Sequence, residues 1–275
     1  MKANSEYLQM PRHFWAYVRT ISQGCGYTDR KTKKVKIPTI ESIIKAFDDL
    51  GLDISEILHN GHLTDFGTQL LGYFEYRANV LNDYVKPRLM NKDQAQQVFE
   101  ELYSELSPNC PLPMNKQKGE KKANAFFTCI INMLIEHEIN GRICDYDPRK
   151  LTTVTNGGRP LRTLARRVDG AYPSVVNPTA IWEIKEYYYT TTFGSRVADG
   201  VYETLLDGME LSELHEHEGI KVHHYLMIDD YFTWWECGRS YLCRIIDMLH
   251  MGYADEVLFG YEVVERIPKI VNEWL

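Results

Sequence analysis

The sequence predicts an α/β fold class (mixed α+β), with a central mixed β-sheet flanked by helices and a helical N-terminal domain before it. In the first part, apolar residues recur at helical spacing, as in Ile40, Ile43 and Phe47. In the second part, runs rich in β-branched and aromatic residues alternate with helical patterns. The 275 residues, of which 44% are hydrophobic and 25% charged, are enough to bury a sizeable core.

Three helices are predicted in the first 90 residues. They lie around Trp15, from Pro38-Thr39 to Gly51, and from the predicted N-cap Thr64 to near Pro87. Two shorter helices followed by a longer one are typical of a helix-turn-helix or winged-helix DNA-binding module. A plain helical bundle has the same pattern, so both alternatives stay open.

The domain boundary is predicted after a further helix at 91–106. Three prolines follow within residues 108–113, and proline interrupts regular structure. We therefore expect an N-terminal domain over 1–106, a linker over 107–115 and a second domain over 116–275.

The second domain is predicted to alternate helices and strands. A buried helix at 123–139 precedes a hairpin, 151–155 and 161–168, with a glycine turn at 156–158. The elements expected next are a strand at 180–189, a helix at 195–216, a strand at 222–228, a helix at 237–252 and a final helix.

The net charge of −7 conceals segregated charges. Residues 1–36 hold eight Lys or Arg against two acids, residues 149–167 hold six and no acid, and residues 199–218 hold seven acids and no Lys or Arg. Such segregation permits a basic groove on an acidic body, although each run is also compatible with a solvated face. The candidate DNA-binding residues are Arg30, Lys31, Lys33, Lys34, Lys36, Arg159, Arg162, Arg166 and Arg167.

Several classes of protein are disfavoured. The six cysteines include no CxxC pair, which argues against a zinc knuckle or a disulfide framework. The first residues lack the apolar core of a signal peptide, and no stretch predicts a membrane span, so we expect a cytoplasmic protein. GxxxxGK[ST] and GxGxxG are absent, so no nucleotide cofactor is expected.

The chemically informative residues are Asp169, Glu183 and Lys185. Because alternate side chains of a strand share a face, Glu183 and Lys185 point together while Trp182 and Ile184 point into a core. If Asp169 ends the preceding strand of the hairpin, its carboxylate meets Glu183 across the sheet. The sequence therefore predicts two acids and one ammonium group at a common point.

Such a cluster favours a divalent cation. Two carboxylates about 4 Å apart repel by roughly 4 kcal/mol at an effective dielectric constant near 20. Mg²⁺ removes that repulsion, since it prefers hard carboxylate oxygens and water. A bound metal ion polarises a phosphoryl oxygen and activates water, and a neighbouring lysine stabilises developing charge.

The pieces Val168-Asp169-Gly170 and Glu183-Ile184-Lys185 resemble the PD-(D/E)XK nuclease superfamily, which includes many type II restriction endonucleases. The resemblance covers about residues 120–230, and Val168 stands where the motif has proline. It implies a restriction-endonuclease-like sheet and Mg²⁺ held by Asp169, Glu183 and the Ile184 carbonyl. Lys185 would serve the nucleophilic water. An additional helical acid would be Glu136, with Glu138 second.

The function that the sequence predicts is therefore a Mg²⁺-dependent endodeoxyribonuclease. A type II restriction enzyme would act as a homodimer on a specific site in double-stranded DNA. Two alternatives stay open. One is a non-catalytic winged-helix DNA-binding regulator, and the other is a structure-specific repair or phage-defence nuclease of the same superfamily.

Overall fold

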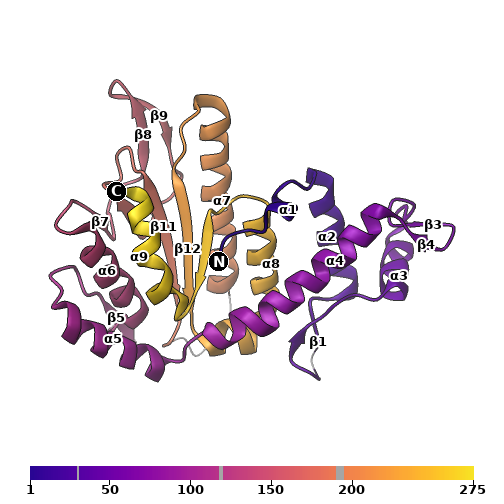
Figure 1. Cartoon of the computed structure of the whole chain (residues 1–275), viewed down its shortest axis with the longest axis horizontal. Coiled ribbons are helices and arrows are strands. Elements are labelled where there is room, and N and C mark those ends of the chain that lie inside the picture. The colour runs from indigo at the N-terminus through magenta and orange to yellow at the C-terminus, as the bar shows by residue number, and fades with distance from the viewer. Residues whose placement is uncertain (30, 118–119, 190–194) are drawn as a thin grey trace.

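A five-stranded mixed sheet lies at the centre of the second part of the chain in the computed structural model, which describes residues 1–29, 31–117, 120–189 and 195–275 (Figure 1). The strand order is β13-β12-β11-β10-β7. β11, β12 and β13 are parallel, whereas β10 is antiparallel to β11 and to β7. The strands are β7 (Asp145–Tyr146), β10 (Gly170–Tyr172), β11 (Ala180–Glu186), β12 (His223–Asp229) and β13 (Glu256–Phe259).

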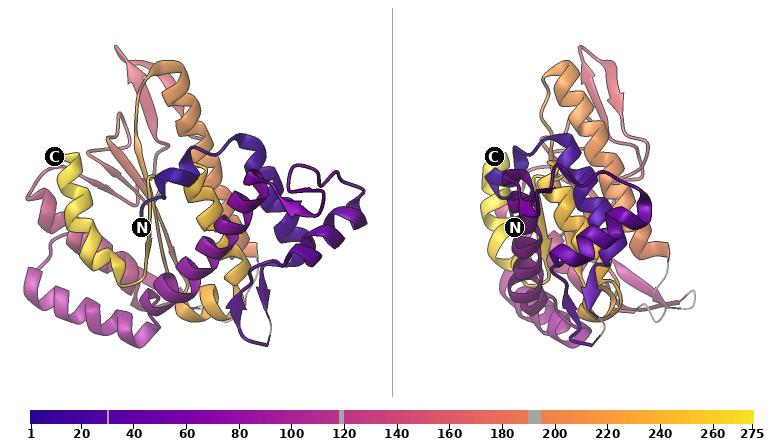
Figure 2. Two further views of the ribbon diagram at one scale, coloured as in Figure 1. Left: turned by 45° about the vertical axis from the view of Figure 1, so that its right-hand side comes forward. Right: turned by 90° about the vertical axis from the view of Figure 1, so that its right-hand side faces the viewer.

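Helices cover both faces of this sheet, which confirms the predicted fold class (Figures 1 and 2). One face packs Trp182 and Met227 against α5 (Lys92–Leu106), α6 (Phe126–Ile139) and α9 (Glu262–Trp274). The other packs Leu226 and Ile228 against α7 (Ser195–Glu218) and α8 (Arg239–His250). β12 and β13 therefore each contribute apolar side chains to a core on each face of the sheet.

The N-terminal part consists mainly of α2 (Arg12–Cys25), α3 (Ile40–Leu50) and α4 (Asp65–Asn79), which match the three predicted helices. The Thr64 side chain accepts a hydrogen bond from the backbone N–H of Gly67 (2.9 Å), so the predicted N-cap is confirmed. The short elements are α1 (Ser5–Leu8) and the hairpins β1 (Thr28–Asp29) with β2 (Lys34–Val35) and β3 (Leu58–His59) with β4 (His62–Leu63). The winged-helix alternative stays a prediction.

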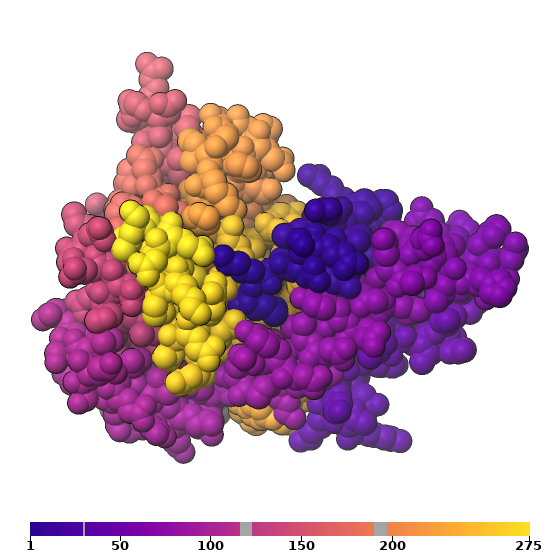
Figure 3. Space-filling model, viewed as in Figure 1, coloured from indigo at the N-terminus to yellow at the C-terminus, as the bar shows by residue number. Residues whose placement is uncertain are grey.

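Residues that precede the predicted linker pack against the second part of the chain at several places. α4 continues through η1 (Val80–Val85) and η2 (Lys86–Arg88), and Val85 lies in the core beside α8. On α5, Ala95 and Phe99 share a core with α6. Figure 3 shows the first residues beside α9, where Lys2 Nζ lies 3.1 Å from Glu273 Oε1. The domain boundary at 107–115 stays a prediction, although α5 packs with the second part.

The hairpin before the candidate site differs in extent from the prediction. β8 (Thr153–Asn156) and β9 (Arg159–Thr163) pair as expected, and Gly157 and Gly158 both have positive φ (55° and 80°). The predicted strand at 161–168 is wrong beyond Thr163, because the chain leaves the hairpin and joins the central sheet at β10. β13 was not predicted. The remaining elements are the hairpin β5 (Met114–Gln117) with β6 (Glu120–Asn124), and η3 (Phe232–Cys237).

Within the ranges that the structure describes, none of the helices combines the length and the apolar character that a bilayer crossing requires.

Candidate active site

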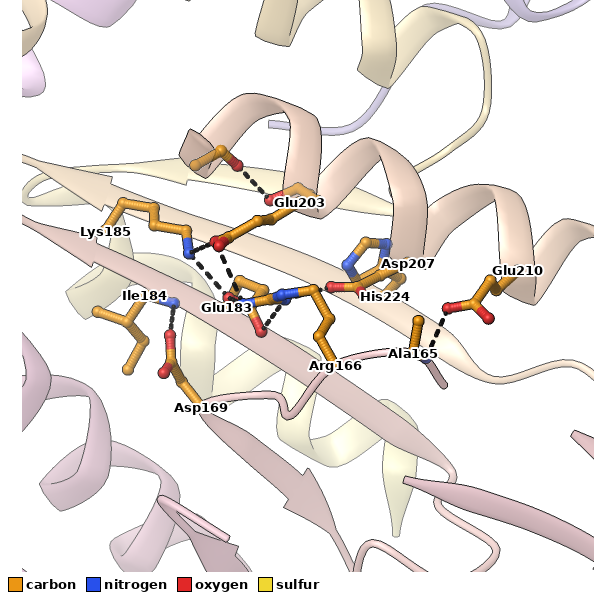
Figure 4. A network of polar contacts seen from close by, with 12 residues as sticks. Ala165, Arg166, Asp169, Glu183, Ile184, Lys185, Glu203, Asp207, Glu210 and His224 are labelled. Carbon is orange, nitrogen blue, oxygen red and sulfur yellow. Dashed lines mark hydrogen bonds and ion pairs between the residues drawn. The ribbon is translucent and has the colours of Figure 1, made fainter. Parts of the chain in front are cut away.

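Strand β11 carries two of the three predicted catalytic side chains on one face. Trp182 is fully buried and Ile184 packs against the same core, on the face covered by α6 and α9. Glu183 and Lys185 point to the opposite face, where Lys185 Nζ donates to Glu183 Oε2 at 3.0 Å (Figure 4). The predicted alternation is therefore confirmed, and burial of Trp182 fixes both charged side chains.

Asp169 approaches the edge of the same strand from the residue directly before β10. Its backbone N–H donates to the carbonyl of Trp182 (3.1 Å), and its Oδ2 accepts from the N–H of Ile184 (2.7 Å) (Figure 4). The N–H and C=O of a strand residue point to the same side, so the Ile184 carbonyl also faces the side of Asp169. The structure thus gathers Asp169, Glu183 and Ile184 at one point of the sheet.

Arg166, which is one of the candidate DNA-binding residues, contributes a second cation to this cluster. Its Nη1 lies 2.9 Å from Glu183 Oε1 and 2.6 Å from Asp207 Oδ2, and its Nη2 lies 3.3 Å from Glu203 Oε2. Lys185 Nζ also reaches Glu203, at 2.9 Å. Each of these two cations thus connects Glu183 of β11 to acids of α7.

The acids of α7 were missed as site residues. In the sequence, residues 199–218 stand out only as an acidic run. Glu203 and Asp207 are four residues apart, so they share a helix face, and Glu210 continues it by accepting from the Ala165 N–H (3.0 Å). This spacing was the signal that could have identified an acidic face.

Burial and neighbouring charges shift the pKa values of the buried acids in different directions. Burial, with Glu183 adding to it, raises the pKa of Asp169 to about 7, and burial likewise raises that of Asp207 to about 7. For Glu183 burial acts in the same direction, but Lys185 and Arg166 outweigh it and lower its pKa. Burial opposes the charge of Lys185, yet Glu183 and Asp169 raise its pKa. At neutral pH Glu183 and Lys185 are charged, while Asp169 titrates.

A cavity of about 520 Å³ lies beside Asp169, and several predicted basic residues line it. Arg167 is exposed there, and Arg149 pairs with Asp147 at 2.8 Å. The full lining is Asp147, Arg149, Leu151, Ala165, Arg166, Arg167, Val168 and Asp169. A polyanion would meet positive charge on its way to Asp169.

The other predicted DNA-binding residues are divided between two regions. On the β8–β9 hairpin, Arg159 is exposed, whereas Arg162 Nη2 lies 2.7 Å from Glu213 of α7. On the β1–β2 hairpin, Lys31 and Lys34 are exposed, Lys33 pairs with Glu236 (3.0 Å), and Lys36 donates to the Cys25 carbonyl (3.0 Å). Arg30 lies outside the described residues. Their contact with DNA stays a prediction.

Glu136 is not brought to the site. Its Oε2 accepts from the backbone N–H of Asn109 at 2.9 Å, and α6 covers the Trp182 face of β11, opposite to Glu183. Among the side chains that the structure describes, it has no contact with Asp169, Glu183 or Lys185. The helical acid expected at Glu136, or at Glu138 on the same helix, is therefore corrected: the acids near Lys185 come from α7.

The donor set fits a hard cation that keeps much of its water. In the described part of the chain, no group of three or more His, Cys, Asp or Glu side chains is arranged to hold a metal ion. Asp169, Glu183 and the Ile184 carbonyl offer two carboxylates and one backbone oxygen, which suits Mg²⁺. Burial and the neighbouring Glu183 raise the pKa of Asp169 more than Lys185 and Arg166 lower it, and a bound cation would favour its ionised form.

Comparison with known proteins gave two family matches. Residues 90–274, more than half of the chain and including every residue of the cluster, match the family described as Domain of unknown function (DUF7687). Residues 1–84 match a second family, Domain of unknown function (DUF7690). Searches of curated proteins and of solved structures gave no match. Both family limits place α5 with the second part, as its packing on α6 does.

Proposed function

The chain belongs to the DUF7687 family, and we propose that it is a Mg²⁺-dependent endodeoxyribonuclease that hydrolyses phosphodiester bonds of double-stranded DNA. One observation carries the proposal: Asp169 is anchored at 2.7 Å to the Ile184 N–H while Glu183 and Lys185 meet at 3.0 Å on the same strand. The proposal includes that the protein acts in the cytoplasm as a homodimer, as a type II restriction endonuclease would.

The residues on and beside β11 would have two different roles, metal binding and positioning of the attacking water. Asp169, Glu183 and the Ile184 carbonyl would hold Mg²⁺, which supplies a Lewis acid for the phosphate and lowers the pKa of bound water. Lys185 Nζ, fixed between Glu183 (3.0 Å) and Glu203 (2.9 Å), would orient the attacking water and stabilise charge developing on the phosphate oxygens. The water oxygen bonds to phosphorus as the P–O3′ bond breaks, leaving a 3′-hydroxyl and a 5′-phosphate.

Asp207 and Glu203 would position these groups through Arg166. The guanidinium contacts both carboxylate oxygens of Glu183 and is itself held by Asp207 (2.6 Å). A fixed orientation of Glu183 is what a metal ligand requires, because loss of its support misplaces the cation. The exposed Arg167 and Arg149 beside Asp169 would receive the DNA backbone.

The test is cleavage of supercoiled plasmid by the full chain with Mg²⁺ or with EDTA. Glu183→Gln keeps the side-chain volume and should lower the rate at least 100-fold, as should Lys185→Met and Asp169→Asn. Glu136→Gln is the matched control: this acid lies on the other face of the sheet, so its variant should cut at the wild-type rate. Full cleavage by Glu183→Gln would end the assignment.

The alternatives remain outcomes of the same assay. A non-catalytic regulator would retard the plasmid without cutting it, in Mg²⁺ and in EDTA alike, and the exposed Lys31 and Lys34 are the observation that favours it. Discrete fragments from a sequenced plasmid would support a restriction enzyme. A smear would support a structure-specific repair or defence nuclease.

A further inference from the structure

A second cavity lies between the two parts of the chain, away from β11. Its volume is about 480 Å³, within the range of small-molecule sites. α2 of the N-terminal part forms one wall, and α7 and α8 form the other. Its lining includes Arg19, Tyr27, Tyr202, Arg244 and Met248.

Arg244 is the residue of this cavity that indicates the charge of its ligand. Its guanidinium lies 5.3 Å from the centre of the Tyr27 ring and 4.9 Å from that of Tyr241, and its Nη1 donates to the Tyr202 hydroxyl at 3.1 Å. Among the described side chains, no carboxylate lies within ion-pair distance of Arg244. A half-buried guanidinium held in place by phenol groups, without a counter-ion, is prepared for an anion.

Among the described residues that line the cavity, the single acid, Asp247, is already paired with a cation. Asp247 lies 2.9 Å from Nη1 of the buried Arg77 and accepts from the Tyr73 hydroxyl (2.6 Å). Arg19, exposed on α2, adds a second positive charge to the lining. The cavity therefore presents two guanidinium groups whose charge the neighbouring carboxylate does not cancel.

The rest of the lining is apolar and aromatic. Val201, Leu205 and Met248 form an apolar wall, and the Tyr202 ring, which is 53% exposed, offers a face for stacking. We propose that this cavity binds a nucleoside monophosphate, with its phosphate on Arg244 and Arg19 and its base against Tyr202 and the apolar wall. The sequence lacks the glycine-rich nucleotide-binding motifs, and for that reason no nucleotide cofactor was expected. The proposed site does not use a glycine-rich loop, so the absence of these motifs does not argue against it.

The ligand would touch the same turns of α7 that serve the candidate active site. Val201, Tyr202 and Leu205 face the cavity, whereas Glu203 contacts Lys185 and Arg166 on the other side of the helix. A ligand that rigidifies these turns would steady Glu203. The binding proposal itself stands independently of nuclease activity.

Calorimetric titration of the full chain, without Mg²⁺ or DNA, tests the proposal. The probes are AMP, GMP, CMP and UMP, with adenosine and inorganic phosphate as the two halves of the ligand. We expect at least one monophosphate to bind ten times more tightly than adenosine or phosphate. Arg244→Leu should weaken that binding at least tenfold, and Arg12→Leu, an exposed position on α2 outside the cavity, should change it less than twofold.

A second variant guards against a folding defect. Tyr202→Ala removes a half-exposed ring together with the hydroxyl that accepts from Arg244, and it should weaken the monophosphate at least tenfold while weakening inorganic phosphate by a clearly smaller factor. Three results would overturn the proposal: no heat with any monophosphate at millimolar concentration, phosphate binding as tightly as the best monophosphate, or equal losses in Tyr202→Ala and Arg12→Leu. The experiment measures binding and not DNA cleavage. The binding result can therefore be interpreted even if the protein proves to have no nuclease activity.

Discussion

Arg166 and Glu183 form a two-point ion pair, with Nη1 2.9 Å from Oε1 and Nη2 3.0 Å from Oε2. Glu183 and Asp207 are both fully buried; Asp207 is paired with this guanidinium, and Glu183 shares it with Lys185. The basic segment before the site is therefore partly an internal counter-ion, because α7 folds its acidic face over it. Only the part of the segment that α7 does not cover remains available to an outside polyanion.

Removal of this guanidinium should destabilise the protein. Arg166→Met removes the ion-pair partner of the buried Asp207 and one of the two cations that contact Glu183, and we expect the free energy of unfolding to fall by about 2–4 kcal/mol. Urea unfolding at pH 7 measures it, with Arg167→Met, the exposed neighbour, as the control expected to change stability by less than about 0.5 kcal/mol. Equal stability of both variants would show that the pair is not needed.

The raised pKa of Asp169 predicts how stability depends on pH. A carboxyl with a folded pKa of about 7 binds more protons in the folded than in the unfolded state between about pH 4 and 7, so unfolding becomes easier as pH rises through that window. Asp169→Asn removes this dependence and can still accept from the Ile184 N–H. Between pH 5 and 8 the wild type should lose at least about 1 kcal/mol more than the variant. If the free energies of unfolding of the wild type and of Asp169→Asn changed equally with pH, the raised pKa of Asp169 would be contradicted.

Cleavage and Mg²⁺ affinity should depend on the same proton. Asp169 must be ionised to hold a cation, so its proton competes with Mg²⁺ below pH 7. At subsaturating Mg²⁺ we expect the cleavage rate to rise about tenfold per pH unit below the pKa and to level off above it. The check is a series of rates from pH 5.5 to 8.5 at fixed ionic strength; a flat profile would remove Asp169 from the metal site.

Gly170 allows the strand carrying Asp169 to approach Trp182. A Cβ at this position would lie 2.1 Å from Cε2 and Cζ2 of the indole, so the backbone would have to shift. Gly170→Ala should cost roughly 2–4 kcal/mol of stability and displace Asp169 from its anchor on Ile184. In the control, Gly72→Ala, the new methyl group meets only the Tyr7 hydroxyl at 4.0 Å, and helix α4 should keep or gain stability. The melting temperatures of the two variants, compared with that of the wild type, test this prediction.

Much of the local structure was predictable from the residues. Thr64 caps α4, glycines turn the β8–β9 hairpin, and the alternation around Trp182 places Glu183 and Lys185 together. Such features depend on neighbours within a few positions, where hydrophobic period and turn chemistry suffice. The class of fold followed from the same patterns, because alternating strands and helices bury their apolar faces in one common arrangement.

Tertiary structure alone decided which charges meet. Arg166 and Asp207 are 41 residues apart, and their ion pair exists because α7 crosses the face of β11 that Trp182 does not occupy. For the same reason Glu136, an acid on a neighbouring helix, lies across the sheet from Glu183. Long-range pairing depends on the path of the chain in space, which no local pattern records, whereas periodicity and capping determine each element separately.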